Sequence, residues 1–150
     1  METLDAAGFT QQEAVSHVRE LCRSYDTNDR EACFFGLGRF NSYLLTADPK
    51  KAIDWCNSES SDRDKAACYF GETSTAARDR LKEIVQYCGT LPTTAFRSVC
   101  YQDLAYYLDA NGDSVENAMK FCEAGDVVCE KGFKDFAPDP WGYILKNFRR

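Results

Sequence analysis

The sequence predicts an all-α protein, a solenoid of four disulfide-stapled antiparallel helical hairpins followed by a short C-terminal capping helix. Two observations lead to this prediction: the cysteines recur regularly, and similar helical patterns flank them each time. The eight cysteines are Cys22, Cys33, Cys56, Cys68, Cys88, Cys100, Cys122 and Cys129. Taken alternately from the first, they lie 34, 32 and 34 residues apart. A period of about 20 to 50 residues is typical of helical repeat proteins.

The first helix of each hairpin is predicted to run up to the first cysteine of its pair. Apolar residues three, four and seven positions apart form one stripe on such a helix. A large apolar side chain precedes each of these cysteines: Leu21, Trp55, Tyr87 and Phe121. Thr10, Asp48 with Pro49, and Ser114 are the start signals of the first, second and fourth of these helices. The third is expected to begin near Arg78.

The second helix of each hairpin is predicted to begin around the second cysteine. Three residues after that cysteine the sequence has Gly36, Gly71 and Gly132, and Asp103 in the third repeat. A glycine costs a helix about 1 kcal/mol relative to alanine. Its recurrence at one position therefore predicts close approach of a neighbouring helix backbone. At Asp103 we expect looser or rotated packing.

These patterns divide a single domain of 150 residues into four units and a cap. The units span about residues 10–45, 48–77, 78–110 and 114–137, and the cap spans 140–150. Because the ends of a solenoid must be covered, we expect the cap to lie over the open end of the stack. Its apolar residues are Trp141, Ile144, Leu145 and Phe148.

Geometry favours disulfides within each hairpin. The end of one helix lies beside the start of the next in an antiparallel hairpin, within disulfide reach. The predicted pairs are Cys22–Cys33, Cys56–Cys68, Cys88–Cys100 and Cys122–Cys129. The competing scheme, which links each hairpin to the next, would leave Cys22 and Cys129 unpaired at opposite ends. Each loop closed by a hairpin pair would stabilise the fold by about 3 kcal/mol in the chain-entropy model.

The residue types argue against metal, redox and catalytic chemistry. Zinc sites and redox couples usually contain cysteines two to four residues apart, and the sequence has no C-x-x-C. The only histidine, His17, is expected on a helix surface, and no nucleophile motif accompanies it. The segment 109–116 resembles the start of a calcium loop, but its twelfth position is Lys120, which would repel a cation. We therefore predict no catalytic residue, no metal ligand, no cofactor and no enzymatic activity.

Charge and hydropathy narrow the possible partners and compartments. A net charge of −6 and a pI near 4.8 disfavour nucleic acid, and no apolar stretch reaches the roughly 20 residues of a membrane span. Disulfides persist in oxidising compartments, so we expect an extracytoplasmic protein: secreted, periplasmic or an ectodomain. The polar start METLDAAGFTQQ is not a signal peptide, so an export signal or anchor is expected to be absent from this sequence.

The layout resembles the tetratricopeptide/Sel1-like superfamily, most of all its disulfide-rich secreted bacterial members. The segment FCEAGDVVCEKGF carries this resemblance, with its C-x6-C spacing and Gly132 after the second cysteine. The resemblance implies a right-handed helical solenoid that binds proteins or peptides. A second resemblance is to the twin C-x9-C proteins of the mitochondrial intermembrane space, although the spacings here are 10, 11, 11 and 6.

Two functions remain open from the sequence. The first is a non-catalytic binding module for a protein or peptide, with Tyr101, Tyr106 and Tyr107 as candidate groove residues unless they belong to the core. An acidic module favours a basic partner. The second is a structural spacer or ectodomain without a groove ligand. A binding module should expose an apolar patch of several hundred Å², whereas a spacer should be polar all round.

Overall fold

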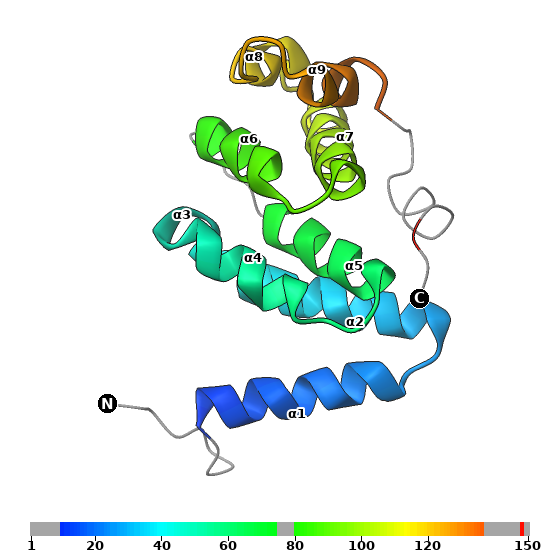
Figure 1. Ribbon diagram of the computed structural model, residues 1–150. Helices are drawn as coiled ribbons and strands as arrows, with labels where there is room; N and C mark the ends of the chain where they lie inside the picture. Colours follow the sequence, from blue (N-terminus) through cyan, green and yellow to red (C-terminus); the bar gives the residue numbers. More distant parts are fainter. Residues whose placement is uncertain (1–9, 75–79, 137–147, 149–150) are drawn as a thin grey trace.

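The computed structural model describes residues 10–74, 80–136 and 148, and these residues are all-helical (Figure 1). The helices are α1 Gln11–Ser24, α2 Thr27–Phe40, α3 Leu44–Ala47, α4 Pro49–Asn57, α5 Asp62–Thr73, α6 Leu81–Thr90, α7 Thr94–Ala110, α8 Val115–Met119 and α9 Val127–Lys134. The predicted all-α class is confirmed for this part of the chain.

The three predicted helix caps are present. Thr10 begins α1 with a capping box, in which the Glu13 amide donates to the Thr10 hydroxyl and the Glu13 carboxylate accepts from the Thr10 amide. Asp48 accepts from the Lys51 amide ahead of α4, and Ser114 caps α8. The helix start that we expect near Arg78 lies outside the described residues.

Four disulfides join the cysteines in the predicted pairs. Their Cα–Cα distances are 5.4 Å for Cys22–Cys33, 5.5 Å for Cys56–Cys68, 5.5 Å for Cys88–Cys100 and 5.8 Å for Cys122–Cys129. Each disulfide ties a helix, or the turn that follows it, to the helix that comes next in the chain. The disulfides therefore join helices that are neighbours in sequence.

One helix end differs from the prediction. The first helix of the last pair, α8, ends at Met119, before Cys122 rather than at it. Only six residues separate Cys122 from Cys129, so the chain must turn early to bring the two cysteines together. Gly125 makes this turn with a positive φ of 83°, and Asp126 then caps α9 through the amides of Val128 and Cys129.

Packing is uneven along the chain. The most extensive helix contact joins α2 to α5, and the next joins α7 to α9. One large core cluster draws its residues from α3 to α9 together with Phe148, while a small cluster lies between α1, α2 and α5. In Figure 1, α1 lies at one end of the molecule and α8 and α9 at the other. As a result, α1 is the least embedded of the long helices.

The glycine prediction holds at Gly71, holds at Gly132 for a side chain rather than a backbone, and is wrong at Gly36. A Cβ at Gly71 would overlap the backbone of α2 at the Phe35 carbonyl, and a Cβ at Gly132 would crowd Tyr101 of α7. A Cβ added at Gly36, however, would have no neighbouring atom within 4 Å. The close contact on α2 is made instead by Gly38, which meets the Cys68 backbone of α5.

Two further positions differ from the sequence prediction. Asp103 is buried and accepts a hydrogen bond from the Thr73 hydroxyl of α5 at 3.1 Å, so the packing there is not loose. Phe148 stacks on Phe96 of α7 at 5.2 Å, and its carbonyl accepts from Arg63 of α5. At this residue the C-terminal segment packs on the middle helices, not over the last hairpin. The other predicted cap residues, Trp141, Ile144 and Leu145, lie outside the described residues.

Candidate binding surfaces

An apolar hollow of about 440 Å³ lies between α1 and α2. Its lining residues are Ala14, Val15 and Val18 of α1 with Cys33, Gly36, Leu37 and Phe40 of α2. The Cys22–Cys33 disulfide closes the hairpin at one end. Most lining residues lie on the far side of that staple, toward the start of α1 and the end of α2. The hollow is therefore the open end of a hairpin that is pinned at its other end.

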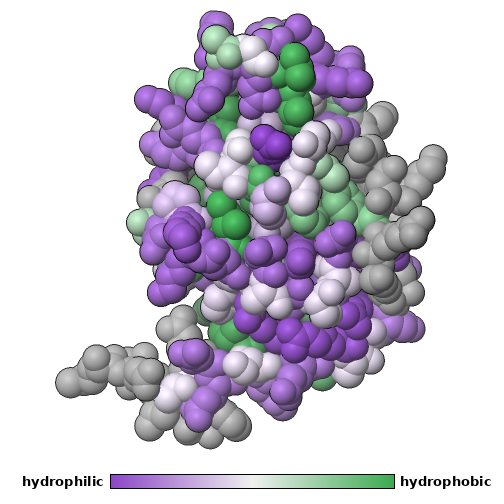
Figure 2. All heavy atoms as spheres, viewed as in Figure 1, coloured by the Kyte–Doolittle hydropathy of each residue, from purple (hydrophilic) through white to green (hydrophobic). Residues whose placement is uncertain are grey.

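Large apolar side chains remain in contact with water around this hollow. Phe40 is 57% exposed and Val18 is 37% exposed. By contrast, the face of the molecule in Figure 2 is mostly hydrophilic, with small apolar areas separated by polar side chains. An apolar concavity with exposed aromatic and aliphatic side chains on its walls is the usual form of a binding site for an apolar ligand surface.

A second, more polar cleft of about 320 Å³ lies between α6, α7 and the turn after α8. Arg97, Glu123 and Asp126 line it, together with the exposed ring of Phe121. The charge of Asp126 already serves the fold, because its carboxylate caps α9 and accepts from the Tyr101 hydroxyl at 3.5 Å. Burial, assisted by Asp126, raises the pKa of Tyr101. We regard this cleft as secondary to the apolar hollow.

The three predicted groove tyrosines do not share one surface. Tyr101 is only 1% exposed, and its ring packs on Phe133 at 5.7 Å, so it belongs to the core and only its hydroxyl reaches the polar cleft. Tyr106 and Tyr107 are exposed on α7. The prediction that Tyr101 lines a groove is therefore wrong for its ring, which is buried and unavailable to a ligand.

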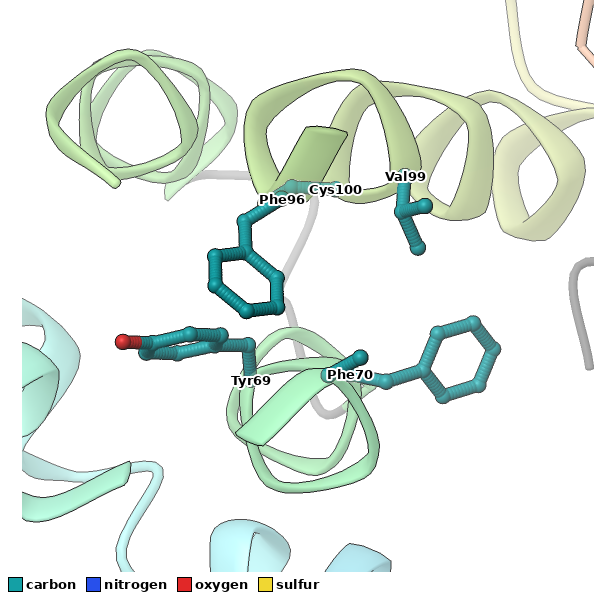
Figure 3. Close-up of a pocket in the computed structure, with 6 residues that line it drawn as sticks. Tyr69, Phe70, Phe96, Val99 and Cys100 are labelled. Carbon is teal, nitrogen blue, oxygen red and sulfur yellow. The ribbon is translucent and has the colours of Figure 1, made fainter. Parts of the chain in front are cut away.

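The space between α5 and α7 is closed. Figure 3 shows the rings of Tyr69 and Phe96 facing each other across it, and their centroids are 5.3 Å apart. The free volume is only about 10 Å³, which is room for about one water molecule. This region is packed core rather than a ligand site.

Two buried carboxyl groups are held in the interior by neutral hydrogen-bond donors. Glu72 accepts hydrogen bonds from the Tyr87 hydroxyl and from the Asn41 amide. Burial raises the pKa of Glu72 to about 8, although both hydrogen bonds lower it. Burial likewise raises the pKa of Asp103 to about 8, opposed by the Thr73 hydroxyl. Burial thus favours the neutral, protonated form of both groups.

One group among the described residues has the ligand types of a metal site. Cys56, Cys68 and Glu72 lie close enough for their ligand atoms to share an ion. The two sulfurs are bonded to each other, however, and a metal prefers free thiolates. His17 lies on the exposed surface of α1. The absence of enzymatic activity stays a prediction.

The sequence patterns missed the apolar hollow. Val15, Val18, Leu37 and Phe40 carry the right spacing for buried stripes, and nothing in a single sequence says that such stripes lack a partner.

Among the described residues, no helix has the length and apolar character to cross a membrane. No protein-family model, curated protein or solved structure matches this chain.

Proposed function

We propose that this chain is a non-catalytic protein- or peptide-binding module and that the apolar hollow between α1 and α2 is its binding surface. The observation that carries the proposal is the hollow itself, with Phe40 and Val18 exposed on its walls. Leaving such side chains in water forgoes roughly 25 cal/mol for each Å² that a partner would bury. A pure spacer gains nothing from this exposure.

We propose the architecture and the compartment that the sequence predicts. The four stapled helix pairs would form a right-handed solenoid of the tetratricopeptide/Sel1-like kind, which commonly binds proteins. Four disulfides support an oxidising environment outside the cytoplasm, and the mitochondrial intermembrane space is the alternative. The net charge of −6 favours a basic partner.

Site-specific photo-crosslinking tests the proposal. A photoreactive phenylalanine analogue replaces Phe40, and the folded chain is irradiated in the extracytoplasmic fraction of its source. We expect a discrete crosslinked protein that disappears when Gly36→Leu fills the hollow. The same analogue at Tyr107, which is exposed on α7, is the matched control.

The outcomes separate the alternatives. No specific adduct from position 40 would favour the spacer function. An adduct only from position 107 would move the binding surface to the exposed tyrosines of α7.

A further inference from the structure

We infer that the hollow receives an amphipathic α-helix of a partner protein, with an apolar stripe and a basic flank, laid along α2 against Gly36. This inference rests on the proposed function and deepens it. It names the conformation and charge of the segment that binds, which the shape of the hollow alone does not determine.

The other helices show what occupies the equivalent position. Three residues after the second cysteine of the later pairs stand Gly71, Asp103 and Gly132. Gly71 contacts α2, Asp103 is bonded to Thr73 of α5, and Gly132 contacts α7. In each case the neighbour is the cysteine-bearing second helix of the preceding pair. This position is therefore where one helix packs on the helix before it.

In α2 the equivalent residue is Gly36, and no helix of the described residues covers it. Gly36 is exposed, with open space where a Cβ would lie, and the small side chain of Ala32 is exposed one turn earlier on the same face. Gly38, two residues on, faces about 200° away around the helix and is occupied by the Cys68 backbone of α5. Thus α2 has backbone access on two opposite faces, and a helix fills only one of them.

The chemistry of the lining favours a helix over an extended peptide. The backbone groups of α1 and α2 are already used within the helices, so the walls offer aliphatic and aromatic side chains rather than donors and acceptors. An extended segment would bury unpaired amide and carbonyl groups against them, at a cost of about 1 to 3 kcal/mol each. A helix satisfies its own backbone and buries only its apolar stripe.

The chain is acidic, with a net charge of −6, and one exposed carboxylate stands on the face of α2 that lines the hollow. On α2, Asp29 is exposed and stands four residues before Cys33 and seven before Gly36, hence on the same face. This carboxylate and the net charge of −6 favour a helix with a basic flank.

Two exposed arginines stand on the same two helices, and the chain as a whole keeps its net charge of −6. Arg23 of α1 forms an ion pair with Glu59 at 3.1 Å. Arg39 is the only exposed cation among the described residues of α2. A second copy of this chain would bring its own net charge of −6 to the same surface. Charge therefore argues for a basic partner and against a second copy.

Binding of synthetic helical peptides tests the inference. The probes are three fluorescent peptides of equal length: a Leu/Ala stripe flanked by Lys, the same stripe flanked by Glu, and a scrambled Lys peptide without a stripe. They are titrated with the oxidised full chain and followed by anisotropy. We expect the first to bind at least fivefold more tightly than the second, and the third not to bind.

Variants of the chain localise the binding. Gly36→Leu should weaken the first peptide at least tenfold while the melting temperature stays unchanged or rises, because open space surrounds Gly36. Asp29→Asn, a near-isosteric change at an exposed position, should reduce the preference for Lys flanks. Val127→Ser, at an apolar residue that is 71% exposed on α9, should leave binding unchanged.

Several results would overturn the inference. Three results would contradict a helix in the hollow. They are unchanged binding to the Gly36→Leu variant, equal binding of the scrambled peptide, and no binding of any helical peptide. Equal binding of the Lys-flanked and Glu-flanked peptides would remove the basic flank. A chain that sediments as a dimer, and becomes monomeric on Gly36→Leu, would show that a second copy fills the hollow. Failure of the peptides alongside successful crosslinking at position 40 would leave the binding function intact and remove only the helix.

Discussion

The helix α2 packs in two contrasting ways on its two faces. Toward α5, glycines bring the helix backbones into contact, and the guanidinium of Arg30 holds both carboxylate oxygens of Asp64 at 2.9 and 2.6 Å. Toward α1, the helices are pinned by the Cys22–Cys33 disulfide and then separate around the hollow. The same helix thus makes a closed interface on one side and an open one on the other. What differs is whether a neighbouring helix is there to fill the space.

Electrostatic contacts add to the attachment of α1. Arg19 and Arg23 both reach Glu59, in the loop after α4, at 2.9 and 3.1 Å, and Arg19 also lies over the ring of Trp55 at 4.4 Å. Burial nevertheless raises the pKa of Glu59 although both arginines lower it. Desolvation therefore outweighs the attraction, and these ion pairs position α1 more than they stabilise it.

The largest expected effect comes from reducing the disulfides. Each pair contributes about 3 kcal/mol in the chain-entropy model, so full reduction should lower the melting temperature by tens of degrees, measured by circular dichroism. Cys22→Ser with Cys33→Ser should have a narrower effect, because α1 has little packing beyond its staple. We expect faster hydrogen exchange in α1 while α5 and α7 stay protected. An unchanged melting temperature on reduction would show that the staples are incidental.

A second large effect on stability is expected from pH, and it arises from the two buried carboxyl groups, Glu72 and Asp103. The pKa of Glu72 and of Asp103 is about 8 in the folded chain and about 4 in an unfolded one. Between these values the folded state holds protons that the unfolded state has released. The free energy of unfolding should therefore fall as pH rises from about 4 to 8 and level off above that.

The matched variant for the pH prediction is Glu72→Gln, which keeps an acceptor for Tyr87 and cannot titrate. Urea unfolding at pH 5, 7 and 9 should show a shallower decline for Glu72→Gln than for the natural chain, and shallower still with Asp103→Asn added. Identical pH slopes in all three chains would mean that neither carboxyl group holds its proton in the fold.

The closed interface should be intolerant of added atoms. Gly71→Ala places a methyl group against the Phe35 carbonyl of α2, and overpacking of this kind costs about 1 to 3 kcal/mol. The midpoint of urea unfolding should fall accordingly. Gly112→Ala separates backbone strain from crowding. Gly112 has a positive φ of 71° and open space around it, so a loss of stability there comes from the backbone alone. Full stability of Gly71→Ala would mean that α2 and α5 are not in backbone contact in solution.

The sequence predicted what depends on near neighbours in the chain. Thr10, Asp48 and Ser114 were identifiable as caps because a cap bonds to an amide two or three residues away. The cysteine pairs were predictable because a hairpin brings sequence neighbours together. Gly36 and Tyr101 were not, since what faces each of them is set by helices elsewhere in the chain. The candidate hollow escaped prediction for the same reason.

The smallest effect is also the sharpest test of the comparison. Gly36→Ala adds one methyl group where the structure has open space, and alanine favours a helix over glycine by about 1 kcal/mol. The variant should therefore unfold at a higher urea concentration than the natural chain, the opposite of Gly71→Ala at the equivalent position of its helix. Measuring both at several protein concentrations adds a further constraint. If Gly36→Ala were destabilising only at high concentration, a second copy would already cover the hollow. A gain in stability at every concentration would show that this face of α2 is uncovered in the chain alone.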